Sequence, residues 1–185
     1  MLDGEEKLIK DAINGEASAF GLLYDRYQPK IYRFIYLKVS HREEAEDLAH
    51  QVFLSAWEKI ENFQFKKNSS YFSGWLYQIA RNKIIDHYRT RKNNLDISKF
   101  QIIDEKNRPE SAFEKNLNIK EIKQAISLLN PNEQDVIIMR FVEELSPKET
   151  SKALGKSEVS IRITQHRAIK KLKNILNNKS KSAIL

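Results

Sequence analysis

The stretch SPKETSKALGKSEVSIRITQHRAIKKLK, residues 146–173, carries the strongest local structural signals in this chain. Its start has a complete capping pattern, because Ser146 is a favoured N-cap, Pro147 suits the first helical position and Glu149 stands three residues after the cap. Gly155 can end that first helix in the left-handed conformation. Two helices joined by such a turn, the second one strongly basic, are the pattern of a DNA-reading helix-turn-helix.

The second of these helices has two unlike faces. Ser157 can cap it, and we expect it to continue to about Leu176, with an apolar arc, Leu176 included, that packs on the preceding helices. On the opposite arc, Arg can bridge guanine acceptors and apolar side chains can contact thymine methyl groups. The predicted DNA-contacting residues of this arc are Ser157, Val159, Ser160, Arg162, Ile163, His166, Arg167 and Lys170.

The helix before this pair opens with the same signals. Asn130 can act as the cap, Pro131 as the first helical residue, and Glu133 as the reciprocal capping partner. We therefore expect the C-terminal part of the chain to be a compact run of three or four helices.

Charge is concentrated in the same part of the chain. The net charge is +7, and by count of Lys, Arg, Asp and Glu residues 119–185 carry +6 of it, against +2 for residues 1–93. A localised basic surface is expected of a protein that binds a polyanion. Charge alone does not separate DNA from RNA or from an acidic membrane surface.

Length and composition exclude several other classes. With 185 residues and 41% hydrophobic residues, the chain can form one or two small domains with real cores. No apolar run approaches the roughly 20 residues that cross a bilayer, and the acidic start is unlike a secretory signal, so we expect a cytoplasmic protein without membrane insertion. Without Cys, and with four scattered His, we expect no metal and no cofactor.

Helical periodicity runs through almost the whole chain, and the predicted fold class is all-α. The stretch 94–118 loses this periodicity, mixes both signs of charge and contains Pro109, which indicates an extended linker. We therefore predict two small helical domains, one at 1–93 and a helix-turn-helix domain at 119–178, with a tail at 179–185.

A helix predicted from His41 to Ile60 pairs a broad apolar arc, which includes Trp57, with an acidic stripe. The stripe contains Glu43, Asp47, Gln51, Glu58 and Glu61, with Leu54 in its middle. An acidic rim around an apolar residue is typical of a protein-docking face. Single exposed apolar residues are also common on solvated helices, so both interpretations stay open.

A second informative helix is predicted from Phe72 to Asn93, with Tyr88 on its core arc. It follows a polar loop at Asn62–Ser70 that holds two aromatic residues and two lysines. Aromatic rings beside basic groups suit the stacking and gripping of unpaired bases, although core aromatics at a loop edge are an alternative. The candidate residues of the loop and of the polar face of the helix are Asn62, Phe63, Phe65, Lys66, Lys67, Asn68, Arg81, Asn82, Arg89 and Lys92.

Four segments together resemble a known family. They are AEDLAHQVFLSAW (45–57), FSGWLYQIARNKIIDHYR (72–89), LNPNEQDVIIMRF (129–141) and HRAIKKLK (166–173). In order and spacing they resemble the short sigma factors of the sigma-70 family, most of all the extracytoplasmic-function group, which keeps only regions 2 and 4. The resemblance covers nearly the whole chain.

The resemblance implies a sigma factor that directs bacterial RNA polymerase core to promoters and starts transcription, in a stress or envelope response. Asp47, Gln51, Leu54 and Glu58 would dock on the clamp helices of the largest polymerase subunit. The ten candidates at 62–92 would capture and open the −10 element, and the eight on the basic helix would read the −35 element. Region 4 would also contact the polymerase flap.

The resemblance also implies that the polymerase, not this chain, carries the catalytic chemistry, and that a separate anti-sigma factor controls the protein. The main alternative is a helix-turn-helix regulator that binds a duplex operator independently of polymerase. A nucleic-acid-processing enzyme is disfavoured, because with five Gly the chain has no phosphate-cradling loop and its acidic groups lie beside Lys and Arg.

The chain departs from the family pattern at four places, one of which is Thr164, where Arg is frequent. His50 and Gln51 stand where Gln and Glu are more frequent, which removes one charge from the acidic stripe. Thr150 and Ser151 replace a common Ile-Ala pair. Gln165 falls on the apolar arc of the basic helix, where it predicts looser or rotated packing of that helix.

Overall fold

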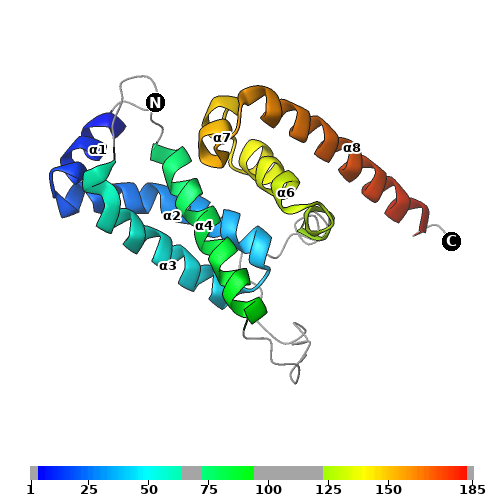
Figure 1. The fold of residues 1–185 in the computed structure, drawn as a ribbon, viewed down its shortest axis with the longest axis horizontal. Helices are drawn as coiled ribbons and strands as arrows, with labels where there is room; N and C mark the ends of the chain where they lie inside the picture. Colours follow the sequence, from blue (N-terminus) through cyan, green and yellow to red (C-terminus); the bar gives the residue numbers. More distant parts are fainter. Residues whose placement is uncertain (1–3, 64–71, 94–122, 183–185) are drawn as a thin grey trace.

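The computed structural model describes residues 4–63, 72–93 and 123–182 (Figure 1). The helices along them are α1 (Glu5–Ile13), α2 (Ala17–Val39), α3 (Arg42–Lys59), the 3-10 turn η1 (Ile60–Asn62), α4 (Phe72–Asn93), α6 (Pro131–Ile137), the π turn η3 (Ile138–Val142), α7 (Pro147–Leu154) and α8 (Glu158–Ser182). Residues 123–127 are also helical. These ranges contain no strand, and the predicted all-α fold class is confirmed.

The N-terminal domain is a bundle in which α2, α3 and α4 pack lengthwise and α1 covers one end (Figure 1). Its centre is aromatic as well as aliphatic, because the rings of Phe34 and Tyr77 meet edge to face at 5.3 Å between centroids. The turn between α2 and α3 is set locally. Ser40 adopts a left-handed conformation that ends α2, and the His41 ring accepts a hydrogen bond from the Glu44 amide that caps α3.

The C-terminal domain follows the capping signals of the sequence. Both capping boxes form, with the Glu133 amide donating to Asn130 at 3.0 Å and the Glu149 amide donating to Ser146 at 3.1 Å. Gly155 has a φ of 61°, the left-handed conformation that ends α7. These features confirm the predicted helix-turn-helix geometry of α7 and α8.

Helix α8 differs from the prediction in length. It was expected to end near Leu176 and instead continues to Ser182, past the predicted start of the tail at 179. The physical reason lies in the residues beyond Leu176, which contain neither Pro nor Gly and include Lys, a good helix former. Leu176 itself, predicted on the apolar arc, is exposed because α8 extends beyond the helices that cover its first turns (Figure 1).

Two predicted core residues of the N-terminal domain are less covered than expected. Trp57 is 37% exposed and packs one side of its ring on Phe20, at 5.0 Å between centroids. Tyr88 is 44% exposed, and its hydroxyl donates to the Lys38 carbonyl oxygen at 3.0 Å. Both lie in the last turns of their helices, where neighbouring helices cover only part of the apolar arc.

The two domains contact each other along α4 and α7 and between α2 and η3. Gly74 lies where α4 approaches α7 closely, since a Cβ atom at this position would be in van der Waals contact with the Glu149 carbonyl oxygen, at 3.4 Å. The described parts of the two domains therefore pack side by side (Figure 1). The proposed boundaries at 93, 118 and 178 remain predictions.

The capping box of α7 gives a stability prediction. Replacing Ser146→Ala leaves the Glu149 amide without its acceptor and should cost about 1 kcal/mol of unfolding free energy, which lowers Tm by roughly 2–4 °C. Thermal unfolding followed by circular dichroism measures this shift. Ser151→Ala is the matched control, because the Ser151 hydroxyl only donates within its own helix, to the Lys148 carbonyl oxygen. Equal shifts for both variants would contradict the capping role.

Candidate functional site

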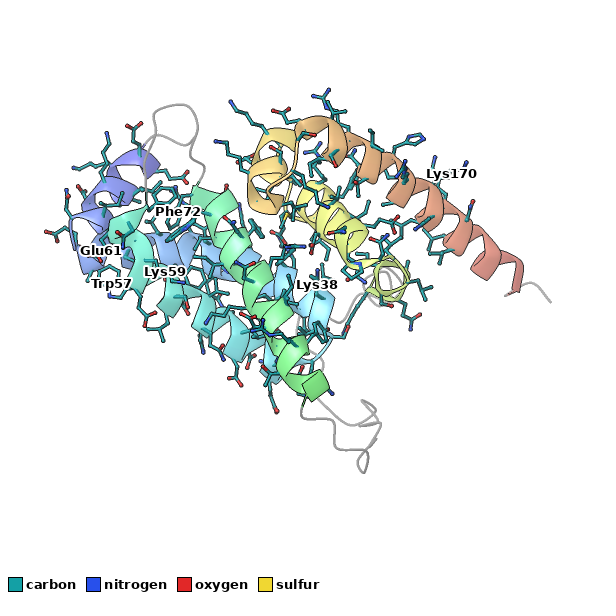
Figure 2. The ribbon with its side chains drawn as sticks, in the orientation of Figure 1. Lys38, Trp57, Lys59, Glu61, Phe72 and Lys170 are labelled. Atoms are coloured by element: carbon teal, nitrogen blue, oxygen red, sulfur yellow. The ribbon has the colours of Figure 1, made fainter. Side chains whose placement is uncertain are left out.

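The first candidate surface is the outer face of α3, where Asp47, Gln51, Leu54 and Glu58 are all exposed. Leu54 is 59% exposed, while its neighbours Val52 and Phe53 are buried against the bundle. The face continues into the end of α3 and η1, where Figure 2 labels Trp57, Lys59 and Glu61 at the outer end of the domain. The predicted acidic stripe with an apolar centre is therefore a single exposed surface.

The second candidate surface follows α3 in the chain and is only partly described. Asn62 is exposed, and its amide donates to the neighbouring Glu61 carboxylate at 3.4 Å. The Phe63 ring is half-buried and packs on Trp75 and Phe72, at 4.9 and 5.8 Å between centroids. This packing favours the core alternative for Phe63. Phe65, Lys66, Lys67 and Asn68 lie outside the described residues, and so does the side chain of Lys92.

The residues predicted on the polar face of α4 point in different directions. Asn82 and Arg89 are exposed, with Arg89 in a surface ion pair with Asp86 at 3.0 Å. Arg81 is turned toward the C-terminal domain, where its Nε donates to Asp135 at 2.9 Å. The predicted polar face of α4 is thus divided between solvent and the contact with the other domain.

The third candidate surface is the outer face of α8. Ser157, Val159, Arg162, Ile163, His166, Arg167 and Lys170 are exposed, and Ser160 is half-exposed. Ile161 and Ala168 on the opposite side are buried, and Figure 2 shows Lys170 directed away from the rest of the domain. Ser157 has a second task, since its hydroxyl accepts the Ser160 amide at 3.2 Å and caps the helix. The structure brings all eight predicted residues to one side of α8.

Gln165 is accommodated by a partner that sequence reasoning missed. The Arg140 side chain lies between η3 and α8, where its Nε donates to the Gln165 side chain at 3.0 Å and its Nη1 donates to the Leu145 carbonyl oxygen. The polar residue on the apolar arc is therefore hydrogen-bonded, and the predicted looser packing at this position is not needed to explain it. Arg140 thus links α8 to the residues that follow η3.

A second link holds α8 on α6. The Lys171 ammonium lies 2.7 Å from the buried Glu133 carboxylate, which also completes the capping box of α6. Burial alone would raise the pKa of Glu133, but the hydrogen bonds from Lys171 and from the Asn130 amide outweigh it and lower this pKa. The middle of α8 is thus held on α6 by an ion pair as well as by packing.

Two buried carboxylates at the contact between the domains were also missed by sequence reasoning. Asp135 pairs with Lys38 and with Arg81, and Glu143 accepts two hydrogen bonds from Arg33 at 2.7 and 2.8 Å. The bond to Glu143 raises the pKa of Arg33. The partners lie 54 to 110 residues apart in the chain, so local sequence patterns do not reveal them.

Within the described ranges, no group of three or more His, Asp or Glu side chains is placed to hold a metal ion. Among the same residues, no helix has both the length and the apolarity that crossing a membrane requires.

The three surfaces lie on two domains that both match known families. Residues 23–94 match the family described as Sigma-70 region 2, and residues 125–174 match the family described as Sigma-70, region 4. The chain therefore belongs to the sigma-70 family. Its curated relatives place it in the extracytoplasmic-function group, and it is a sigma factor that serves transcription initiation.

Three of these relatives show how far the similarity extends. ECF RNA polymerase sigma factor BldN of Streptomyces coelicolor is 35% identical over 173 residues, which cover 92% of this chain and 65% of BldN. The chain thus spans just under two thirds of BldN. SigX of Bacillus subtilis is 30% identical, with 83% of this chain and 81% of SigX covered, and SigW of the same organism is 29% identical, with 94% and 97% covered.

Solved structures share the fold. CnrH, in the structure of CnrH in complex with the cytosolic domain of CnrY, has a TM-score of 0.75 at 22% identity, over 95% of this chain and 99% of the solved one. RpoE of Bartonella quintana, in complex with the anti-sigma factor NepR, has a TM-score of 0.71 at 22% identity, over 85% and 96% of the two chains. The matches to the two sigma-70 regions and to SigX do not favour the alternative of an independent operator-binding regulator.

The link between Arg140 and α8 can be tested by stability. Arg140→Ala leaves the Leu145 carbonyl oxygen and Gln165 without a donor and should cost about 1–3 kcal/mol of unfolding free energy in urea titration. Replacing both partners together, as Arg140→Leu/Gln165→Leu, should recover part of this loss. The exposed Arg162→Ala is the control and should change stability by less than about 0.5 kcal/mol. A double variant as unstable as Arg140→Ala would contradict the pairing.

Proposed function

We propose that this sigma factor docks on RNA polymerase core through Asp47, Gln51, Leu54 and Glu58 on α3. The observation that carries the proposal is Leu54, an apolar side chain that is 59% exposed between carboxylates on an otherwise solvated face. An apolar centre with a charged rim has the composition of a protein interface, in which the centre loses water and the rim sets orientation. Clamp helices of the largest polymerase subunit are the partner implied by the family.

The residues after α3 would act on the −10 promoter element. Asn62, Asn82 and Arg89 are exposed, whereas Arg81 is half-buried and paired with Asp135 of the C-terminal domain. Stacking of an unpaired base on an aromatic ring returns about 1–3 kcal/mol, which offsets the few kcal/mol lost for each unstacked step. Phe65, Lys66, Lys67, Asn68 and Lys92 complete the proposed set, whereas the packing of Phe63 on Phe72 and Trp75 fits a core role.

The outer face of α8 would read the −35 element in the major groove. Arg162 and His166 can reach base edges, Val159 and Ile163 can contact thymine methyl groups, and Lys170 lies where it can hold a phosphate. The exposure of these side chains on one side of a helix that follows a capped turn supports this role. Region 4 would also contact the polymerase flap.

Partners and location follow from membership of the family. Two solved relatives were captured with another protein, the cytosolic domain of CnrY and the anti-sigma factor NepR, which supports control of this chain by a separate anti-sigma factor. The chain would act in the cytoplasm with RNA polymerase, which would supply the catalytic chemistry. Its group suggests a stress or envelope response.

The docking proposal is tested by reversing the polarity of its centre. Leu54→Glu should weaken association with purified core polymerase at least ten-fold, because a charge would replace the apolar centre of the interface. Leu22→Glu is the matched control, because Leu22 is 56% exposed on α2, away from this face. Association can be measured by surface plasmon resonance, with helical content checked by circular dichroism. Equal binding of Leu54→Glu and wild type would exclude Leu54 from the interface.

The reading face of α8 gives a separate test in holoenzyme. Arg162→Ala should cost about 1–3 kcal/mol at one promoter position and relax base preference there, whereas Lys170→Ala should weaken all sequences alike and reduce the salt slope by about 1. Competition binding with single-base promoter variants at several salt concentrations measures both. If the two variants behaved the same, the division between base reading and phosphate contact would be wrong.

A further inference from the structure

The contact between the two domains contains two carboxylates that have almost no access to water. Asp135 on α6 is fully buried, and it pairs with Lys38 of α2 and accepts from Arg81 of α4 at 2.9 Å. Figure 2 labels Lys38 on α2, on the side that faces the C-terminal domain. Both cations come from the N-terminal domain and the anion comes from the C-terminal domain.

Glu143, which follows η3, is held in the same way. Its two oxygens accept from Nε and Nη2 of Arg33 at 2.7 and 2.8 Å, and one of them also accepts from the Tyr77 hydroxyl at 3.1 Å. Burial and the Glu143 charge both raise the pKa of Tyr77, which keeps its hydroxyl protonated as a donor. The N-terminal domain therefore offers a ready-made set of donors to an anion.

The cations and the carboxylates of this contact lie on different domains. Three cations, Arg33, Lys38 and Arg81, face two carboxylates, so the N-terminal side would carry an uncompensated positive surface once the domains part. The guanidinium fork fits a carboxylate and a phosphate by the same paired geometry. Arg81 cannot hold Asp135 and a phosphate at the same time, so closure of the domains and DNA binding at this surface exclude each other.

Buried apolar side chains of the two domains form one cluster, and the ion pairs are the part of the contact that is suited to opening. The attraction within a buried ion pair is largely offset by the cost of removing both charges from water, and this cost is recovered when the charges are rehydrated. Contacts between domains of one chain commonly separate unless they are large and apolar. A polyanion can therefore compete with Asp135 and Glu143 for the same three cations.

We propose that Asp135 and Glu143 close the free protein by occupying a cationic surface, formed by Arg33, Lys38 and Arg81, that takes DNA phosphates once the two domains separate. The inference rests on the proposed function in that promoter DNA is the polyanion concerned. It adds Arg33 and Lys38 to the DNA-contacting residues and assigns the two carboxylates the role of an internal competitor.

A disulfide across the contact tests whether the domains must separate. The chain contains no Cys, and an ideal Cβ at Gly74 lies 3.6 Å from the Lys152 Cβ, within the disulfide range of about 3.5–4.5 Å. The oxidised Gly74→Cys/Lys152→Cys variant should form at least ten-fold less promoter complex with core polymerase in a gel-shift assay. Reduction should restore the complex. Gly74→Cys and Lys152→Cys alone are the controls for the two substitutions.

Cross-linking is checked by mobility in a denaturing gel and helical content by circular dichroism. A fully cross-linked protein that forms promoter complexes as well as its reduced form would overturn the proposal. If the wild-type protein forms no complex with core polymerase in either condition, the function proposed above fails instead. In that case the next experiment tests whether the two carboxylates hold the domains together, because it needs no polymerase.

The second test removes the internal competitor. Asp135→Asn/Glu143→Gln should increase the radius of gyration in small-angle scattering and raise the affinity of the free protein for duplex DNA at least ten-fold at low salt. The logarithmic salt slope should steepen by about two to three, from the three released cations. Glu16→Gln/Asp25→Asn changes the net charge equally at exposed positions and should alter affinity about two-fold. The proposal would be refuted if Asp135→Asn/Glu143→Gln kept the radius of gyration of the wild type and had the same salt slope as the control variant.

Discussion

The relative placement of the two domains depends on the neutralisation of two carboxylates that the C-terminal domain buries. Asp135 and Glu143 are cut off from water, and an unpaired charge in such a position would cost several kcal/mol. Their partners, Arg33, Lys38 and Arg81, lie on two helices of the other domain, so the pairs can form only when α2 and α4 are correctly packed. Gly74 of α4 lies at the same contact, within van der Waals distance of α7.

Local structure was readable from the sequence because its causes are local. The Asn130 and Ser146 capping boxes need residues only three positions apart, and the left-handed turn at Gly155 needs one residue without a Cβ atom. The exposed stripe on α3 and the basic face of α8 follow from helical periodicity alone. These signals were sufficient to predict two candidate surfaces and the all-α fold.

The parts that sequence reasoning missed depend on contacts between distant segments. Periodicity identifies the apolar side of a helix but not how much of it a neighbour covers, which is why Trp57 and Tyr88 are more exposed than predicted. Gln165 looked misplaced because its partner, Arg140, lies 25 residues earlier. The sequence does show an Arg beside the apolar run of α6 and η3. This Arg indicates a partner for Gln165 only when the two residues are known to lie on helices that pack together.

The function of the chain combines surfaces that are weak when taken separately. A docking face on α3, residues around α4 for the opened element and a reading face on α8 would each bind modestly, but tethering two DNA contacts to one polymerase raises the effective concentration of the second. The faces of α3 and α8 are exposed while the domains are in contact, so this contact would restrict only the surface formed by Arg33, Lys38 and Arg81. The protein thus resembles a specificity subunit whose parts act only after they have been arranged on the polymerase.

The most direct test of this account is run-off transcription from genomic promoter fragments by purified core polymerase, with and without this protein. The account predicts discrete transcripts that start at defined promoters and appear only when the protein is present. Transcripts independent of the protein, together with tight and specific binding of the free protein to a duplex operator, would contradict it.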